Sequence, residues 1–185
     1  TLTGSGVSPK FASNVQSINF GNVRNGTTKR DSVTVSNTGT SDLVIGTIVS
    51  SNGVFTVTPS SGTITQGSSQ KFYVTFAPIV DGTKTGFITF NHNALVPKDS
   101  ISVSGTGVSP VLAMNVQNVN FGNVRTGTSK QDSVIITNTG TSPLTISSVT
   151  SSNVKFTVTP TTSTLAPGAT QKFYLTFSPT ADGAQ

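Results

Sequence analysis

The chain has 185 residues and a net charge of +5 at pH 7, although only 9% of its residues are charged. All six acidic residues are Asp, there is no Cys, and Ser and Thr are abundant, which disfavours helix and favours strands and turns. This composition excludes disulfides and thiolate metal sites, and its eleven Phe, with many Val and Ile, suffice for two cores in domains of about a hundred residues each.

Period-two alternation of apolar and polar residues predicts strands with one buried face. In chain order, the expected strands carry the stretch Val15–Val23, then Val33 with Val35, Leu43 with Ile45, Phe55 with Val57, Phe72 with Val74 and Phe76, Ile88 with Phe90, and Ile101 with Val103. The turn signals between them are Gly21, Asn25–Gly26, Asn37–Gly39, Asn52–Gly53, Gly67 and Asp81–Gly82. About seven short strands at this spacing predict a two-sheet sandwich.

The same elements recur 101 positions later without insertion. Four sequence motifs begin at positions 19, 37, 55 and 70 and again at 120, 138, 156 and 171; they are NFGNVR, NTGTS, FTVTP and QKFY. Between 4–84 and 105–185, 47 of 81 aligned residues are identical, so we expect both copies to take the same fold. The fold prediction is an all-β chain of tandem immunoglobulin-like β-sandwiches, with about seven strands per 101-residue repeat.

The ends of the chain do not coincide with the ends of the repeats. Residues 1–7 match 102–108, so we expect them to be the last strand of a preceding repeat, followed by a complete repeat at 8–108. Residues 109–185 are then a second repeat without its final strands, the counterparts of Ile88–Phe90 and Ile101–Val103. A sandwich in that state exposes unpaired strand edge.

Five stretches together carry a family resemblance: Val15–Val23 with its F-G-x-V core, the Asn37–Gly39 turn, the Phe72–Pro78 strand, Gly82 with the strand after it, and the Ser104–Gly107 end. In this order they resemble the ASH domain family (ASPM, SPD-2, Hydin), including bacterial versions found in tandem in large surface proteins. The resemblance implies an immunoglobulin-like sandwich that serves architecture, attachment or partner binding, and it implies no catalytic residue. The turn Asn91–Asn93 departs from the commoner pattern, in which many relatives have an acidic residue.

Few residues offer chemistry. His92 is the only histidine, so a Ser-His-Asp triad or a histidine metal site would need it, but its polar surroundings predict a solvated turn residue. The candidate calcium ligands are Asp31, Asp81, Asp99 and Asp132, but the acids show no Asp-x-Asp-x-Asp spacing. Asp81–Gly82 and Asp182–Gly183 are typical of tight turns. We therefore predict no catalytic, cofactor-binding or metal-binding residue, and no cofactor.

Two further groups recur in both copies. Tyr73 and Tyr174 occupy the same outward strand position, where one ring per repeat favours cross-strand packing or a domain anchor over a sugar platform. The lysines and acids considered for an isopeptide crosslink are expected on the solvated surface; they are Lys29, Lys71 and Asp31, with their counterparts Lys130, Lys172 and Asp132.

Two glycine-containing motifs are interpreted structurally. Asn25–Thr27 fits an N-glycosylation acceptor, but its counterpart begins with Thr126, so chance explains it better. The stretches GSGVSP and GTGVSP lack the helix and Lys-Ser/Thr of a phosphate cradle, so we interpret them as the domain junction, with Pro9 and Pro110 restricting the backbone.

The basic residues are scattered, with Lys29–Arg30 as the one basic pair, so we expect no nucleic-acid partner. No apolar run approaches the roughly 18 residues of a membrane span, so we expect no membrane insertion within this segment and place any export signal or anchor outside it.

The sequence thus predicts a structural spacer or fibre-forming repeat of a large bacterial cell-surface or secreted protein, and not an enzyme. Its expected partners are neighbouring repeats of the same array, and its expected location is extracellular or at the bacterial cell surface. The alternative is a protein-binding module that captures a partner by strand addition at an exposed sheet edge. An accessory domain of an enzyme ranks third. The incomplete ends leave two interpretations open: the chain is a portion of one longer multi-repeat chain, or Thr1–Gly6, which correspond to a strand that the second repeat lacks, allow head-to-tail self-association.

Overall fold

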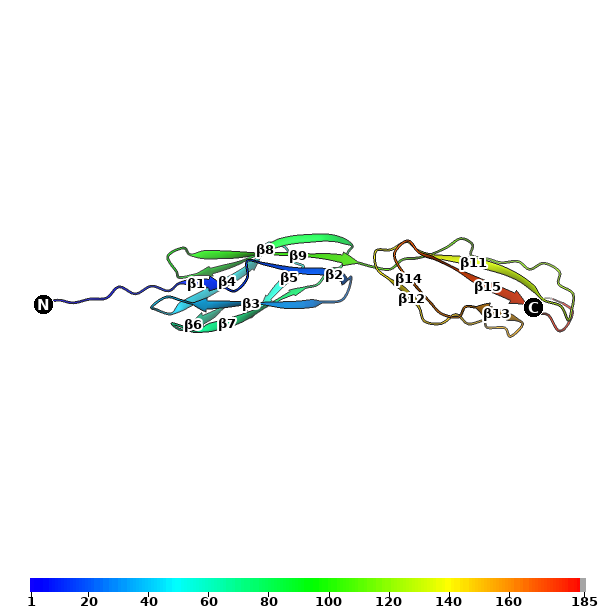
Figure 1. Cartoon of the computed structure of the whole chain (residues 1–185), viewed down its shortest axis with the longest axis horizontal. Helices are drawn as coiled ribbons and strands as arrows, with labels where there is room; N and C mark the ends of the chain where they lie inside the picture. The colour runs from blue at the N-terminus through cyan, green and yellow to red at the C-terminus, as the bar shows by residue number, and fades with distance from the viewer. Residues whose placement is uncertain (184–185) are drawn as a thin grey trace. The chain divides into compact units, whose positions relative to one another are not determined.

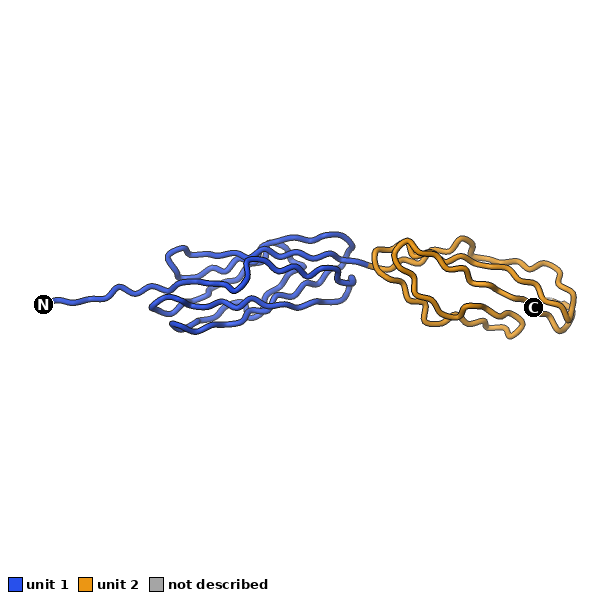
Figure 2. Tube along the Cα trace, viewed as in Figure 1, with its two compact units in different colours: residues 1–108 blue, residues 109–185 orange. Residues whose placement is uncertain are grey.

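A computed structural model describes residues 1–183 and divides the chain into two compact units, Thr1–Val108 (unit 1) and Ser109–Gln185 (unit 2) (Figure 2). Every regular element among the described residues is a strand (Figure 1), so the predicted all-β class and immunoglobulin-like sandwich are confirmed. In the same range, no helix has the length and hydropathy of a membrane span.

Unit 1 contains nine strands in two sheets. One sheet has the order β1-β3-β7-β5 and the other β2-β9-β8-β4-β6. The strands are β1 (Phe11–Ser13), β2 (Ser17–Arg24), β3 (Lys29–Asn37), β4 (Leu43–Ser50), β5 (Phe55–Thr58), β6 (Gly62–Ile64), β7 (Ser69–Phe76), β8 (Gly82–His92) and β9 (Lys98–Val108). The two strands beyond the predicted seven are β1 and β6, whose three residues each are too few to show an alternation.

The predicted inward residues fill the core between these sheets. In β7, Phe72, Val74 and Phe76 are fully buried, while Tyr73 between them is exposed. The buried core also contains Ile18, Phe20, Val23, Val33, Val35, Leu43, Ile45, Phe55, Ile64, Ile88, Phe90, Ile101 and Val103. The predicted strand register of unit 1 is therefore confirmed.

Strand β2 runs parallel to β9, in contrast to the antiparallel pairs of the rest of unit 1. Its register shifts between Asn19 and Asn22, around Gly21, whose φ of 64° lies in the left-handed region that glycine tolerates. The Asn19 side chain accepts a hydrogen bond from the Gly21 amide at 2.9 Å. This bulge lets β2 follow β9 to the end of unit 1.

Unit 2 repeats the first sheet completely and the second sheet in part. The first has the order β10-β11-β15-β13, whereas the second contains only β12 and β14 among the described residues. The strands are β10 (Leu112–Met114), β11 (Lys130–Asn138), β12 (Leu144–Ile146), β13 (Phe156–Thr159), β14 (Ser163–Leu165) and β15 (Thr170–Phe177). Residues 118–125, the counterpart of β2, belong to no strand. In unit 1 this segment pairs with β9, whose counterpart would lie beyond the described residues.

Candidate functional site

A buried asparagine ends the long strand β3 and organises the start of unit 1. Asn37 is 1% exposed, and its Nδ2 donates to the carbonyl oxygens of Ser41 at 2.7 Å and Ile64 at 2.9 Å. Its Oδ1 accepts from the amides of Gly39 at 3.0 Å and Lys10 at 3.3 Å. Because a buried amide side chain is costly unless its groups are paired, these four bonds fix the turn that follows β3.

This turn holds the leading segment of the unit, residues 8–10. The Thr40 amide donates to the Ser8 carbonyl at 2.8 Å, the Ser8 amide to the Thr40 hydroxyl at 3.1 Å, and the Thr38 amide to the Lys10 carbonyl at 3.0 Å. A Cβ at Gly39 would collide with the backbone of Ser8 and Pro9. The turn therefore needs glycine for close approach.

Unit 2 repeats the same clamp on its leading segment, residues 109–111. Asn138 is fully buried and bonds to Ser142, Leu165, Gly140 and Val111. The Thr141 amide donates to the Ser109 carbonyl at 2.7 Å, and the Ser109 amide donates to the Thr141 hydroxyl at 2.9 Å. The sequence predicted turns at the two Asn-Thr-Gly motifs, but it did not show that these turns bind the first residues of each unit. Their recurrence in both copies was the available signal.

The end of unit 1 is fixed just as closely. The Val108 carbonyl accepts from the Asn25 amide at 2.9 Å, and the Asn25 Nδ2 lies 2.5 Å from Asp81 Oδ1. Gly105 and Gly107 are buried within β9, and a Cβ on Gly105 would lie 2.5 Å from the Phe76 ring. Both glycines belong to the last strand of unit 1, where Gly105 allows β9 to pack on Phe76, and the boundary between the two units follows between Val108 and Ser109.

Both units contain the same cluster of three phenylalanine rings, and the cluster is more exposed to solvent in unit 2 than in unit 1. In unit 1, Phe20, Phe55 and Phe76 are at most 1% exposed, with Phe55 and Phe76 stacked at 4.8 Å. The equivalent rings of unit 2 are Phe121, Phe156 and Phe177, with the last two stacked at 4.5 Å. Phe121 is 7% and Phe177 9% exposed, so the same cluster is less well covered there.

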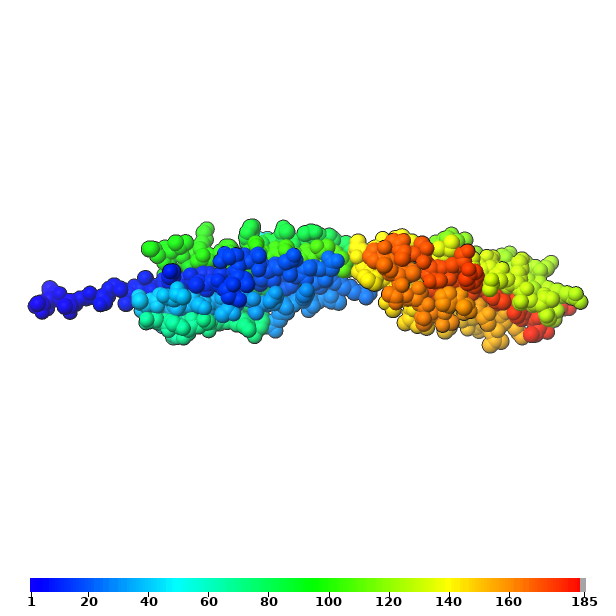
Figure 3. All heavy atoms as spheres, in the orientation of Figure 1, coloured from blue at the N-terminus to red at the C-terminus, as the bar shows by residue number. Residues whose placement is uncertain are grey.

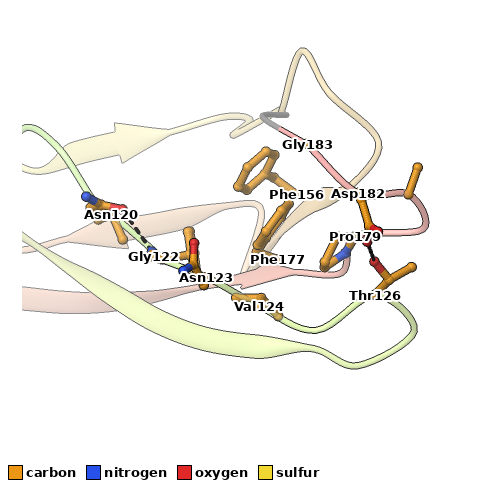
Figure 4. A pocket seen from close by; sticks show the side chains of 13 residues that line it. Asn120, Gly122, Asn123, Val124, Thr126, Phe156, Phe177, Pro179, Asp182 and Gly183 are labelled. Carbon is orange, nitrogen blue, oxygen red and sulfur yellow. Dashed lines mark hydrogen bonds between the residues drawn. The ribbon is translucent and has the colours of Figure 1, made fainter.

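A cavity of about 690 Å³ opens over this second cluster (Figure 4), and we call it the groove. Phe156 and Phe177 form its apolar floor, and residues 119–124 line one wall. Near the labelled Pro179, the Thr126 hydroxyl donates to Asp182 Oδ1 at 2.6 Å. An apolar floor beside a segment without strand structure is suited to receiving an extended peptide.

His92 is not the solvated turn residue that the sequence predicted. It ends β8 with its side chain 0% exposed, stacked on Phe11 at a ring distance of 4.9 Å. Its Nε2 lies 3.0 Å from Asp99 Oδ2, while Nδ1 accepts from the Ala94 amide at 3.3 Å. The polar neighbours Asn91 and Asn93 suggested exposure, but the strand alternation that buries Ile88 and Phe90 continues to His92.

The other candidate residues make contacts within their own units. Tyr73 is exposed as predicted, with the Arg30 guanidinium 3.8 Å above its ring, and Tyr174 has Lys172 at 5.9 Å. Lys29 Nζ donates to the Phe20 carbonyl at 2.7 Å, and Lys130 repeats this contact with Phe121. Among residues 1–183, no three His, Cys, Asp or Glu side chains gather as a metal ion requires.

The two packed sheets, with Asn-Thr-Gly clamps at their ends, define each unit as an immunoglobulin-like domain. The family described as HYDIN/CFA65/VesB-like, Ig-like domain matches residues 9–106 and again 110–185. The chain belongs to this family, which confirms the resemblance stated from the sequence. Immunoglobulin-like domains of this kind are non-catalytic binding or structural modules.

Solved structures resemble this chain at low identity and with TM-scores below 0.5. A protein of unknown function from Porphyromonas gingivalis W83 is 18% identical with a TM-score of 0.48, covering 91% of this chain and 83% of its own. The ASH/PapD-like domain 7 of human CEP192 is 22% identical with a TM-score of 0.49, covering 54% and 86%. The CsuC-CsuE chaperone-tip adhesion subunit complex of Acinetobacter baumannii is 15% identical with a TM-score of 0.41, covering 95% and 90%. No curated protein matches the chain.

Proposed function

We propose that the chain is a non-catalytic spacer or fibre-forming part of a large bacterial cell-surface or secreted protein, which projects or links other domains. The observation that carries the proposal is the joint between the repeats. The Val108 carbonyl is bonded inside unit 1, and the next residue, Ser109, is bonded through its amide and carbonyl inside unit 2. No residue is left over as a flexible linker.

A joint of this kind suits a spacer because reach depends on linker stiffness. Flexible linkers gain about 5–6 Å times the square root of their residue number, and domains joined by them sample many separations. A joint without spare residues keeps the separation of consecutive repeats nearly constant. In this proposal residues 1–7, 8–108 and 109–185 are successive parts of one array, whose neighbouring repeats are its partners.

Spin labels on equivalent residues of the two units test this directly. Thr56 and Thr157 are exposed strand positions one repeat apart in sequence, and the chain contains no Cys to compete for the label. With Thr56→Cys and Thr157→Cys, we expect electron–electron distance measurements on dilute protein to give one narrow distribution. Inserting Gly-Ser-Gly-Ser between Val108 and Ser109 should broaden it without changing the stability of either unit. Equal widths in both proteins would reject the spacer.

The groove favours a second candidate function, capture of a partner strand. Residues 118–125 take no strand structure although their counterpart β2 is a full strand, and the apolar floor beside them is accessible. Backbone pairing with an added strand would supply both hydrogen bonds and cover. A synthetic peptide of residues 101–108, the strand that fills this place in unit 1, is the direct probe. Absence of binding to the 185-residue chain would reject strand capture.

A further inference from the structure

We propose that side chains capping the backbone of one sheet edge in each unit close that edge to strands of other copies of this chain. We call it the crossover edge, because the chain passes there from β1 in one sheet to β2 in the other; it consists of β2 and of Lys29–Thr34 in β3. Figure 3 shows this part of unit 1, in shades of blue, on the face turned toward the viewer. Neither proposed function uses these side chains.

The crossover edge leaves strand backbone without a strand neighbour. β1 pairs with only Val35–Asn37 of β3, so among the described residues Lys29–Thr34 pair with β7 alone. β2 is the outermost strand of its sheet and pairs with β9 alone. Exposed edges of this kind are where strands of other chains are added. Two copies would therefore pair through this edge unless its backbone groups were blocked.

Two side chains occupy the amides of β3 that face this edge. Antiparallel strands turn alternate residues toward opposite neighbours, and the Thr34 carbonyl accepts from the Asn14 amide at 3.0 Å, so Thr34 faces away from β7. Ser32, two residues earlier, faces the same way. The Thr34 amide donates to Asn14 Oδ1 at 2.7 Å. The Ser32 amide donates to Asp31 Oδ1, also at 2.7 Å, so neither amide is left for an incoming strand.

Lys29 closes β2 at its register shift. From the start of β3, the Lys29 Nζ donates to the Phe20 carbonyl at 2.7 Å, so this carbonyl points toward the crossover edge and away from β9. Two more side chains occupy neighbouring backbone groups of β2. The Thr27 hydroxyl donates to the Arg24 carbonyl at 2.7 Å, and Asn19 accepts from an amide at the bulge. A strand added beside β2 would have to displace these side chains.

Unit 2 repeats every one of these caps one repeat later in the sequence. The caps of unit 2 are Asn115 on Ile135, Asn120 on Gly122, Thr128 on Arg125, Lys130 on Phe121 and Asp132 on Ser133. Lys130 keeps its contact although residues 118–125 form no strand, so the cap does not depend on a paired β2. Both units therefore block the same edge in the same way.

The lysine cap also adds a charge that opposes pairing between copies. Lys29 is exposed, and the same edge of a second copy carries the same ammonium group. Like charges brought together across two strands are unfavourable, and lysine is a residue with which natural proteins protect sheet edges. Repeats joined in one array experience a high effective concentration of each other, which favours pairing between unprotected edges. The caps keep such repeats from pairing side by side.

Removing one donor cap and one acceptor cap should open the edge. Lys29→Met with Asp31→Ala removes one positive and one negative charge, so the net charge stays at +5. In sedimentation equilibrium of the 185-residue chain, we expect this variant to self-associate at least about tenfold more strongly than the wild type. Lys98→Met with Asp42→Ala makes the same charge change at exposed residues outside the crossover edge and should behave as the wild type. Equal association of the two double variants would overturn the proposal.

Hydrogen exchange at the Ser32 amide shows whether the association uses this edge. In the Lys29→Met, Asp31→Ala variant this amide has lost its acceptor, so at low protein concentration it should exchange faster than in the wild type. At high concentration a strand of the second copy accepts from it, and its exchange should slow again. Fast exchange at every concentration would mean that the caps serve stability alone, and would reject the proposal.

Lys29 alone provides a test that does not require the double variant to fold. Lys29→Arg keeps both the donor and the charge, whereas Lys29→Met keeps only the length of the side chain. We expect Lys29→Met to associate more strongly than the wild type and Lys29→Arg to match the wild type, with circular dichroism confirming that both are folded. A folded Lys29→Met variant that associates no more than Lys29→Arg would contradict the blocking role of this lysine.

Discussion

Asn37 uses both ends of its amide to join three parts of unit 1: the turn after β3, the leading segment and β6. A carboxylate has the same shape but donates no hydrogen bond. Ionised Asp at this position would face the carbonyl oxygens of Ser41 and Ile64 without water to shield it.

Asn37→Asp should therefore lower the free energy of unfolding by about 2–4 kcal/mol at pH 7. Burial and the two carbonyl oxygens raise the pKa of the new carboxyl in the folded state, so the folded variant binds more protons than the unfolded one. The loss should consequently shrink as the pH falls toward about 4, relative to the wild type. Denaturant titrations at several pH values measure this.

Asn14→Asp is the control for that series. Asn14 is exposed, and its Oδ1 accepts from the Thr34 amide at 2.7 Å, a bond that a carboxylate retains. The free energy of unfolding of the Asn14→Asp variant should differ from that of the wild type by no more than about 0.5 kcal/mol. If the stability loss of Asn37→Asp depends on pH no more than that of Asn14→Asp, the buried, hydrogen-bonded position of Asn37 would be contradicted.

The buried position of His92 leads to a second prediction. His92→Ala removes a ring stacked on Phe11 and the contact with Asp99, so we expect a loss of about 2–4 kcal/mol. Lys98→Ala, an exposed change near the same loop, should cost no more than about 0.5 kcal/mol. Equal melting temperatures for the two variants would return His92 to the solvated turn that its sequence context suggested.

Strand β9 depends on glycine for its contact with β7. A Cβ on Gly105 meets the Phe76 ring at 2.5 Å, whereas one on Gly53, also without a left-handed φ, meets nothing within 4 Å. Gly105→Ala should lower stability by about 1–3 kcal/mol through overpacking, and Gly53→Ala should be nearly neutral. Thermal unfolding of both variants makes the comparison. Similar melting shifts would mean that β9 packs less closely than the structure shows.

The strands were predictable where alternation is long enough to be read. Phe72, Val74 and Phe76 against Tyr73 gave the face of β7 directly. The parallel pairing of β2 with β9 was not predictable, because the partners lie some eighty residues apart and strand sequences carry no record of their neighbours. The burial of His92 was missed because its polar neighbours Asn91 and Asn93 suggested a turn, although the alternation of Ile88 and Phe90 continues to it. An exposed strand edge in the second repeat was predicted, but the residues that line the groove were not.

The two units share most of their sequence but not their packing. Unit 1 has a buried cluster of sixteen hydrophobic residues, whereas the corresponding cluster of unit 2 comprises Ile136, Leu165 and Phe173, with partly buried residues around them. Hydrophobic stabilisation scales with the apolar area removed from water. The same residue types therefore stabilise unit 2 less in the described structure.

We expect the chain to unfold in two steps in urea, with unit 2 unfolding first. Phe72→Ala and Phe173→Ala change equivalent positions, 0% and 2% exposed, and identify the steps. Phe72→Ala should lower the urea midpoint of the second unfolding step by an amount equivalent to about 3–5 kcal/mol. Phe173→Ala should instead lower the midpoint of the first step. A single transition affected equally by both substitutions would show that the units unfold together.

The parallel pair β2 and β9 has a mechanical consequence for a chain under tension. Once the leading segment and β1 have been pulled away from β3, a pull through the chain acts on β2 from its N-terminal end and on β9 from its C-terminal end. Because these strands run in the same direction through six paired residues, the pull slides one along the other and loads their hydrogen bonds together. An antiparallel pair pulled from one shared end would open bond by bond. Unit 1 should therefore resist a pull along the direction of β2 and β9 more strongly than a pull across these strands.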